Sequence, residues 1–593
     1  MQIGKILKAL GTGLTVLSMC AALSPAQEPE KAPASTSGGT GTWTPLTNQP
    51  PGAPGIAGAN LSLLLTDGRI LVHEGNTPQW QIFSPDSTGS YIKGTWGLTS
   101  TLPVIGETTY APLYYASAVL ADGRVVIQGG EYNNGPEAFT KLGAFYRPFL
   151  NQWLPLTHNP TNGAGEGDAG SIILASTEKW MVQDPLSTDV AILDPNHQCL
   201  DDTTNYWTAF TPAGKADRND EEPWVLLPDL TVLAIDAENG TNSERYLPNG
   251  GTSSGTWQTA GSTLSPLADP NSAEVGPAVL RPNGTVFATG ACPTSGDTSK
   301  GLPCNNGTTG QTAVFTNTSG SNGGYWDQGP SFPGSGATGL DIADGPGAIL
   351  PNGSVLVFAS PGLYLPGGKF FKYTGSSLVP EPNTPNGPGD PSYVGSMLVL
   401  PTGQIWFADG SGDVEIYTPS TAEAAYQQAW QPTITAVETS AGVPTAALTV
   451  CTPQAMSVGT TYIVTGKRFN GMSQGAYYGD DEQMATNYPL VRITDSTGAV
   501  SYCRTHNHSY MGVQSSAAVS TQFDVGGSSP GNCQPAAGEA SLVVVANGIP
   551  SAPMTILIAS SGLTCPVISC NPCTCPDGGG KRTPAEDAAL AAY

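Results

Sequence analysis

Acidic and tyrosine side chains recur at one position ahead of a repeated sequence pattern. The residue eight or nine places before the turn of each copy is a carboxylic acid in four copies and a tyrosine in two. Equivalent positions of stacked repeats lie together in space, so we expect these side chains to surround one channel. In chain order they are Ala59, Tyr114, Asp168, Glu221, Glu274, Asp344 and Tyr393.

Two binding chemistries suit such a ring. Carboxylate and phenol oxygens favour a hard cation such as calcium over copper, and carboxylates beside aromatic rings also suit the hydroxyl groups of a sugar. Converging carboxylates raise one another's pKa values unless a cation or hydrogen-bond donors intervene. The alternative is that each acid caps the exposed amides of a neighbouring loop, and both interpretations stay open.

The segment THNHSYMGV is a second candidate site because it contains His506 and His508. Side chains two residues apart on an extended segment point the same way, so the two imidazoles could chelate a metal together. The favoured alternative is a polar surface pair or hydrogen-bonded loop residues. Asp480 and Asp481 in YYGDDEQ could form a calcium site, but a turn is the favoured interpretation there.

Hydrolytic chemistry has no specific support in the sequence. His73, His158 and His197 lie far apart, and none of them neighbours a nucleophile. The sequence also contains no phosphate-binding loop and no HExxH motif.

The elements that would position the ring are copies of one pattern: an apolar run, a two-residue turn such as Asp-Gly, and a β-branched run. Each copy predicts a hairpin, and the segments that follow it, often with a tryptophan, complete four strands. Such repeats pack radially, so the sequence predicts an all-β fold with a seven-bladed kelch-type β-propeller over residues 42–431. The copies span 62–75, 117–130, 170–184, 224–236, 277–290, 347–360 and 396–410.

Trp43 precedes the first hairpin and has no copy of its own. We expect its strand to supply the outermost edge of the last blade, which would close the ring and cover an exposed sheet edge. The alternative is a flexible leader followed by an incomplete blade.

The sequence also predicts the segments that flank the propeller. Residues 1–26 have the lysines, apolar run and small residues of a secretion signal, although a lipoprotein signal would instead acylate Cys20. Residues 27–41 are rich in Pro, Ser and Gly and predict a linker. No later apolar segment approaches the ~20 residues needed to span a bilayer.

After Trp430 the repeat stops. Alternating apolar runs over residues 432–560 predict an immunoglobulin-like (E-set) β-sandwich. Residues 561–593 form a cysteine-rich tail that we expect to be partly disordered. The four cysteines of this tail are crowded as in a zinc site, but export favours a small disulfide knot.

The remaining cysteines point to an oxidising compartment. The chain has 11 cysteines, and setting Cys20 aside leaves an even number, which favours disulfides over free thiols. Proximity in the sequence suggests two pairs, Cys292 with Cys304 and Cys503 with Cys533.

The net charge of −25 excludes one class of partner. A field of that sign repels nucleic acids and anionic membranes, whereas cations and neutral polyols suit it. Only 12% of residues are charged, while there are 74 glycines and 52 prolines, a balance typical of β-rich extracellular proteins.

The signal, the seven kelch-like repeats and the sandwich together resemble the galactose oxidase and glyoxal oxidase family of secreted copper radical oxidases. The segment GAYYGDDEQMATNYPLVRITD (475–495) is similar to the family's sandwich domain. In that family, two tyrosines and two histidines bind one copper ion, and a cysteine cross-linked to one tyrosine forms the radical cofactor.

The resemblance implies roles for four residues of this chain. Tyr114 holds the place of the cross-linked tyrosine and Tyr393 that of the axial tyrosine, while His506, with His508 nearby, holds the place of the histidine on the sandwich loop. The tryptophan that stacks on the cross-link would fall near Tyr132.

Two family positions are not kept. Ala59 stands where the cysteine is expected, and Val394 follows Tyr393 where the second histidine is expected. Without the thioether, a one-copper site lacks its second redox centre for a two-electron oxidation.

We therefore expect an exported, monomeric binding module for a carbohydrate or another surface ligand, without copper-radical activity. Asp168, Glu221, Glu274, Asp344 and Tyr132 are its candidate ligand-binding residues. The alternative is a copper-dependent alcohol or aldehyde oxidase with a rearranged site built from Tyr114, Tyr393, His506 and His508.

Overall fold

The computed structural model describes residues 39–559 except for residue 54 and the segments 162–166, 196–205, 250–254, 319–322, 440–443, 447–454, 481–483 and 528–530. The expected secretion signal with Cys20, most of the linker, His197, Asp481 and the cysteine-rich tail lie outside the described residues. The described part is nearly all β. Its helices are short: α1 (Thr421–Ala424), η2 (Gly336–Thr338), η3 (Gly387–Gly389), η4 (Ser392–Val394) and η5 (Gln428–Trp430). In this part of the chain, no helix has the length and apolar character needed to cross a bilayer.

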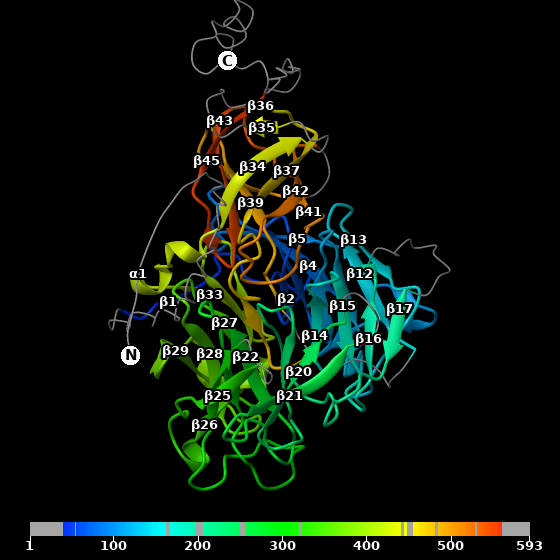
Figure 1. Ribbon diagram of the computed structural model, residues 1–593, viewed down its shortest axis with the longest axis vertical. Coiled ribbons are helices and arrows are strands. Elements are labelled where there is room, and N and C mark those ends of the chain that lie inside the picture. The colour runs from blue at the N-terminus through cyan, green and yellow to red at the C-terminus, as the bar shows by residue number, and fades with distance from the viewer. Residues whose placement is uncertain are drawn as a thin grey trace, which may run out of the picture. The chain divides into compact units, whose positions relative to one another are not determined.

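Each predicted repeat contributes one antiparallel sheet, numbered here sheets 1 to 7 in chain order (Figure 1). Sheet 1 contains β2 (Ser62–Leu64), β3 (Ile70–His73), β4 (Trp80–Ser84) and β5 (Thr95–Leu98). Sheet 2 contains β9 (Ala116–Val119), β10 (Val125–Gln128), β12 (Gly143–Arg147) and β13 (Gln152–Pro155). Sheet 3 contains β14 (Ser171–Leu174), β15 (Lys179–Gln183), β16 (Val190–Leu193) and β17 (Trp207–Phe210).

Sheets 4 to 7 follow the same plan. Sheet 4 contains β18 (Trp224–Leu226), β19 (Val232–Ile235), β20 (Asn242–Leu247) and β21 (Thr256–Ser262). Sheet 5 contains β22 (Val275–Leu280), β23 (Thr285–Gly290), β24 (Thr312–Asn317) and β25 (Gly324–Gln328). Sheet 6 contains β27 (Gly347–Ile349), β28 (Val355–Pro361), β29 (Lys369–Tyr373) and β30 (Leu378–Pro380), with β26 (Leu340–Asp341) paired to β28. Sheet 7 contains β31 (Ser396–Val399), β32 (Ile405–Ala408), β33 (Val414–Thr418) and β1 (Thr42–Pro45).

The predicted pairing of the strand around Trp43 with the last sheet is confirmed. Strand β1 pairs antiparallel with β33, and Trp43 lies opposite Tyr417. The last sheet is therefore completed by the first strand of the chain.

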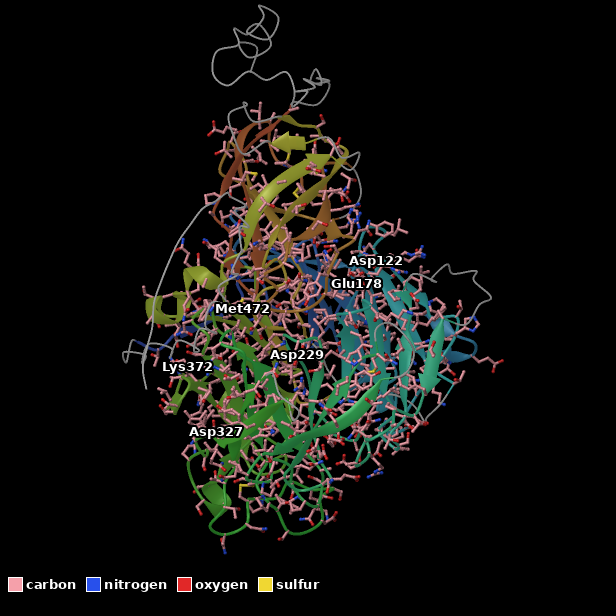
Figure 2. All side chains as sticks on the ribbon, in the orientation of Figure 1. Asp122, Glu178, Asp229, Asp327, Lys372 and Met472 are labelled. Atoms are coloured by element: carbon pink, nitrogen blue, oxygen red, sulfur yellow. A yellow bond between two sulfur atoms is a disulfide. The ribbon has the colours of Figure 1, made fainter. Side chains whose placement is uncertain are left out.

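The turn between the first two strands of each sheet needs one residue in the left-handed conformation. Glycine supplies it in five sheets, whereas the third and fourth repeats use a residue with a side chain; Glu178 of the third repeat is labelled in Figure 2. The third and fourth copies therefore lack the turn glycine of the other five. The residues, with their φ values, are Gly68 (76°), Gly123 (83°), Glu178 (58°), Leu230 (70°), Gly284 (83°), Gly353 (82°) and Gly403 (78°).

In every sheet except sheet 6, a tryptophan lies in the outer strand and faces the third strand of the same sheet. Trp96 lies opposite Phe83 in sheet 1, and Trp326 lies opposite Phe315 in sheet 5. Their ring centroids are 4.9 and 5.2 Å apart. Aromatic cross-strand pairs stabilise a sheet, so the tryptophan spacing marks where each sheet ends.

The first strands of the sheets are buried and follow one another in space. Strand β9 contacts β14, and the succession continues through β18, β22, β27 and β31 to β2. Apolar residues of these strands belong to one hydrophobic core. Short strands with both faces buried account for the apolar runs that open each repeat.

Two further sheets follow sheet 7 and enclose a second core. The first sheet contains β35 (Pro444–Ala446), β34 (Thr433–Thr439), β37 (Thr460–Lys467), β42 (Val519–Val525) and β41 (Thr505–His506). The second contains β36 (Ala455–Met456), β45 (Met554–Ile558), β43 (Gly538–Ala546), β39 (Leu490–Thr494) and β40 (Val500–Cys503), with β44 (Ile549–Pro550) paired to β43. Residues of both sheets, including Val464 and Val544, contribute to that core. We call this region the C-terminal sheets.

Both predicted disulfides are confirmed. Cys292 is bonded to Cys304, and Cys503 is bonded to Cys533. These four are the cysteines that the structure describes, so every described cysteine is paired.

Candidate functional site

Five first strands are preceded by a residue in the left-handed backbone conformation, at or next to the predicted ring position. In this region a side chain crowds the backbone, which costs about 1–2 kcal/mol for a residue other than glycine. Such strain is retained where the surrounding structure fixes it, and it is common at binding sites. The ring position inferred from the repeat thus has a structural counterpart. The residues are Tyr114 (φ 52°), Asp168 (46°), Glu221 (60°), Ala273 (66°) and Asp344 (56°).

The structure brings the four predicted acids together. One carboxylate oxygen each from Glu221, Asp344 and Asp480 lies within 4.8 Å of the other two. Glu274 joins them through a side-chain hydrogen bond with Asp344. Asp168 interacts electrostatically with Glu274 and Asp480. We refer to these five residues, with Glu131 described below, as the acidic cluster.

Burial and mutual repulsion set the protonation of the acidic cluster. Glu221 and Glu274 are only 7% and 5% exposed. Burial, followed by the nearby carboxylates, raises the pKa of Glu221 well above its usual range. The pKa of Asp168 is raised for the same two reasons. Charged carboxylates at this site are therefore unfavourable unless a positive charge or hydrogen-bond donors reach them.

Glu131 is a member of the acidic cluster that the sequence did not single out. Its side chain is hydrogen-bonded to Tyr132 and to Asp168. Burial raises the pKa of Glu131 to about 7, and the Glu137 carboxylate adds to that rise. The bond between the Glu131 and Asp168 carboxyl groups requires a proton on one of them.

Tyrosines flank the acidic cluster. Tyr364 donates a hydrogen bond to Glu274 Oε1, and its ring contacts that of Tyr393 with centroids 5.2 Å apart. The Tyr132 ring meets the Tyr114 ring edge-on at 6.2 Å. Four tyrosines are half-buried: Tyr114, Tyr132, Tyr364 and Tyr393.

The segment between β37 and β39 brings Asp480 to the acidic cluster. Its strand β38 (Ala476–Tyr477) pairs with β27, the first strand of sheet 6. Gln474 Oε1 accepts a hydrogen bond from the Leu226 amide at 2.8 Å, and Tyr488 donates one to the Leu64 carbonyl. This segment therefore contacts the first strands of three sheets. We refer to residues 468–489 as the axial segment.

Beyond Asp480, the axial segment also reaches the predicted tyrosines. The Tyr478 ring stacks on the Tyr114 ring with centroids 6.1 Å apart. The Tyr478 hydroxyl donates a hydrogen bond of 2.5 Å to the Tyr393 carbonyl. Tyr114 and Tyr393 thus both contact Tyr478 of the axial segment. No sequence pattern singles out Tyr478, because its contacts depend on the path of the axial segment.

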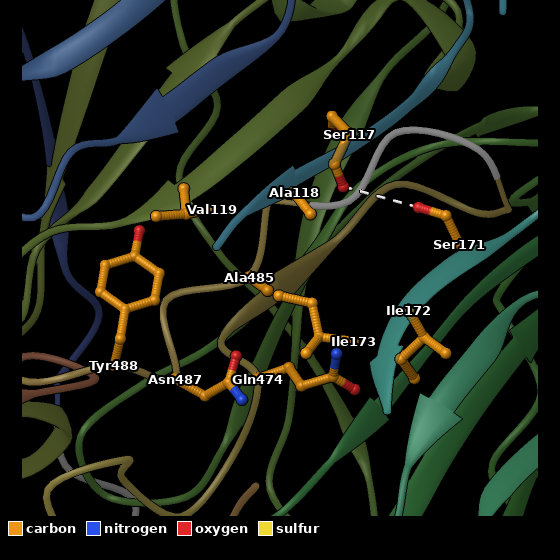
Figure 3. A pocket seen from close by; sticks show the side chains of 10 residues that line it. All are labelled: Ser117, Ala118, Val119, Ser171, Ile172, Ile173, Gln474, Ala485, Asn487 and Tyr488. Atoms are coloured by element: carbon orange, nitrogen blue, oxygen red, sulfur yellow. Dashed lines mark hydrogen bonds between the residues drawn. The ribbon is translucent and has the colours of Figure 1, made fainter. Parts of the chain in front are cut away.

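A small cavity lies where the axial segment meets sheets 2 and 3 (Figure 3). Its volume of about 20 Å³ is enough for a single water molecule. The cavity is therefore too small for a sugar or a comparable ligand. Its lining includes Ser117, Ser171, Gln474, Asn487 and Tyr488.

The expectation that His506 and His508 could chelate one metal is not met by their geometry. His506 Nε2 lies 3.2 Å from Asp524 Oδ1, whereas His508 Nδ1 lies 2.8 Å from Thr521 Oγ1. Asn507, between the two histidines, adopts a φ of 51°, so the segment is not extended throughout. Burial lowers the pKa of His508 to about 3. The geometry favours the alternative interpretation, in which the two histidines are hydrogen-bonded to neighbouring residues.

The residues present do not fit the copper ion of the radical oxidases. Tyr114 and Tyr393 lie near the acidic cluster, but His506 is engaged by Asp524 and the His508 ring is stacked on Tyr488. Within the described part of the chain, no group of three close His, Cys, Asp or Glu ligand atoms includes a histidine. The acidic cluster offers carboxylate oxygens instead, and copper prefers imidazole or sulfur ligands.

No protein-family model and no curated protein matches the chain. Among solved structures, it is similar to a fungal alcohol oxidase of the AA5 family in complex with copper, with 13% identity and a TM-score of 0.47 over 88% of this chain and 100% of that one. It is also similar to a protein described as the extracellular domain of a hybrid two-component system from B. thetaiotaomicron, with 11% identity and a TM-score of 0.40 over 89% and 60% of the two chains. A third similar structure is YjhT, with 14% identity and a TM-score of 0.34 over 56% of this chain and 99% of that one. With TM-scores below 0.5, these structures assign neither a substrate nor a cofactor to this chain.

Proposed function

We propose that this chain is an exported, galactose-oxidase-like protein that binds a carbohydrate or another hydroxyl-rich surface ligand at the acidic cluster and does not carry out copper-radical oxidation. In this proposal sheets 1 to 7 are the blades of a kelch-type propeller, and the C-terminal sheets form an immunoglobulin-like (E-set) domain. The order of contacts from β9 to β2 and the pairing of β1 with β33 support the propeller.

The observation that carries the proposal is the combination of buried carboxylates with half-buried tyrosine rings. Carboxylate oxygens accept hydrogen bonds from sugar hydroxyls, and tyrosine rings pack against the apolar face of a sugar ring while their hydroxyls stay polar. Sites for small ligands have this character, with a few polar groups set among aromatic side chains.

The proposed lack of copper-radical oxidation is based on the cysteines and on the residue at the cross-link position. Ala59 stands at the place of the cross-linking cysteine, and each described cysteine is held in a disulfide. No described cysteine therefore has a free thiol that could form the cross-link which lowers the oxidation potential of a tyrosine.

Two measurements on the purified, full-length secreted chain test the proposal. The first is copper content together with oxygen uptake on a panel of primary alcohols and aldehydes, for which we expect no peroxide. The second is the melting temperature in the presence of glycans, which should rise because a ligand that binds only the folded state stabilises it. Stoichiometric copper with peroxide production would instead favour the oxidase alternative.

Matched variants locate the ligand. Asp168→Asn should abolish the glycan-dependent rise in melting temperature, because it removes an acceptor from the acidic cluster. Asp327→Asn changes the charge equally at an exposed position of β25 and should leave the rise unchanged (Figure 2).

A further inference from the structure

We infer that Glu221, Asp344 and Asp480 form a binding site for one divalent cation of the calcium class. This cation site is separate from the proposed function, because the cation would bind to the protein regardless of which organic ligand the protein takes. It rests on geometry, on a buried oxygen without a partner, and on the contrast with a second acidic group in the same chain.

The spacing of the three carboxylates fits a single ion. Calcium binds oxygen ligands at about 2.3–2.6 Å, so two oxygens on opposite sides of the ion are about 4.6–5.2 Å apart. The ligand oxygens of Glu221, Asp344 and Asp480 all lie within 4.8 Å of one another. One ion can therefore contact all three without a change of backbone.

The second observation is a buried oxygen that lacks a partner. Glu221 is 93% buried, and its Oε2 atom makes no hydrogen bond to any described residue. Glu274, hydrogen-bonded to Asp344, also has a buried Oε2 without a partner among them. A buried carboxylate oxygen without a partner is unfavourable, and a cation would satisfy it.

The ligand types also point to a hard cation. All three side chains offer oxygen atoms, and no nitrogen or sulfur ligand belongs to the group. Oxygen-only sites with several carboxylates select calcium, whereas magnesium retains more of its water and binds through fewer carboxylates.

A second acidic group shows how the same chain compensates buried carboxylates elsewhere. Asp217, Glu222, Asp236 and Glu244 also lie close together. There Lys215 Nζ lies 2.9, 2.5 and 2.9 Å from the carboxylates of Asp217, Glu222 and Glu244. A lysine thus supplies the positive charge that this second group needs.

The main causes of the raised pKa of Glu221 include no positive charge. The strongest influences on this pKa are burial and four carboxylates, those of Glu274, Asp344, Asp480 and Asp168. Either protons or a cation must balance this charge. Above neutral pH, where protons are scarce, a divalent cation balances it and also satisfies the Glu221 oxygen.

The test uses the full-length chain stripped with a chelator, at about pH 8, where the carboxyl groups release their protons most readily. Calorimetric titration with calcium chloride should show one site, with magnesium binding at least about tenfold more weakly. Terbium, which occupies calcium sites, should luminesce when the nearby tyrosines are excited, and calcium should displace it. These measurements on the wild-type chain need no variant.

Variants then assign the site. Glu221→Gln should weaken calcium binding by about tenfold or more and, in chelator, should melt at the same or a higher temperature than the wild type, since it removes repulsion. Asp327→Asn should bind calcium as the wild type does. If calcium and terbium give neither heat nor luminescence with the wild type, or if Glu221→Gln and Asp344→Asn both bind calcium normally, the inference is wrong.

Discussion

At the scale of single residues, the acidic cluster offers groups that can bind a ligand, but these groups destabilise the folded protein when no ligand is bound. Four of its six carboxyl groups lie on loops that precede different first strands, whereas Glu131 follows β10 and Asp480 lies on the axial segment. Burial raises the pKa values of Asp168 and Glu221. Each ionised carboxylate is therefore unfavourable in the ligand-free protein, although it becomes favourable once a positive charge or a donor reaches it.

Glu131→Gln should stabilise the ligand-free protein. Because the folded-state pKa of Glu131 is raised to about 7, the ionised form is disfavoured on folding at higher pH. The gain should be on the order of 1 kcal/mol at pH 8, after allowance for its partial exposure, and should disappear near pH 4. Denaturant unfolding at the two pH values measures it. An equal effect at both would mean that ionisation of Glu131 is not involved.

The sequence identified part of the site and missed the rest for a physical reason. Asp168, Glu221, Glu274 and Asp344 were accessible because each lies at a fixed distance from its own repeat. Glu131, Tyr364 and Tyr478 follow no such rule, since their positions depend on which loop reaches which neighbour. Their contacts are long-range, and no local pattern encodes them.

At the scale of elements, the first turn of each sheet needs a residue in the left-handed conformation. The third and fourth repeats place a residue with a side chain there, at a cost in backbone strain. Glu178→Gly should stabilise the protein by about 1 kcal/mol, because Glu178 adopts a φ of 58°, which glycine accepts without strain. Equilibrium denaturation measures the change.

The reverse substitution is the matched control for the turn. Gly284 has a φ of 83°, and an added Cβ would meet only one side-chain atom, at 4.0 Å. Gly284→Ala should therefore destabilise the protein by about 1–2 kcal/mol through backbone strain alone. If both substitutions change stability in the same direction, the conformation of the turn is not the cause.

Lys372 joins sheet 6 to the residues that follow sheet 7. Its Nζ lies 2.7 Å from Glu381 Oε1 and is ion-paired with Glu423 of α1. Lys372→Met should destabilise the protein by about 3–5 kcal/mol, because it leaves two buried carboxylates without their cation. The exposed pair of Lys300 and Asp297 provides the control. Lys300→Met should change stability by less than about 1 kcal/mol, and comparable losses in the two variants would contradict this role for Lys372.

The elements themselves were largely predictable. Hairpins with Asp-Gly or Asn-Gly turns and regularly spaced tryptophans carry a local signal, and the seven four-stranded units follow from it. The path of the axial segment was not predictable, because its hydrogen bonds join residues hundreds of positions apart, such as Tyr488 and Leu64.

At the scale of the whole molecule, titration of buried groups predicts a loss of stability at high pH. Burial raises the pKa values of Glu131 and Asp236 to about 7 and those of Asp341 and Glu415 to about 8. A carboxyl with a raised folded-state pKa keeps its proton longer in the folded than in the unfolded chain, so stability falls as the pH rises from the unfolded to the folded value.

The buried histidines act in the opposite direction at lower pH. Burial lowers the pKa values of His73 and His508 to about 3. Their contribution to stability is therefore complete above about pH 6.5 and is lost as the pH falls below that value. Between about pH 6.5 and 8.5 the carboxyl groups alone should lower the melting temperature, as calorimetry in a chelating buffer can measure. A melting temperature that rises over this interval would contradict the assignment.

The pairing of β1 with β33 has a consequence for how the chain acquires its structure. Because the chain is synthesised from its amino terminus, Trp43 is made long before Tyr417. Sheet 7 is therefore assembled last, from the two most distant parts of the seven-sheet region, and such remote pairing slows folding. Until synthesis passes Thr418, the edge of β1 has no native partner and is exposed to proteases and to other chains.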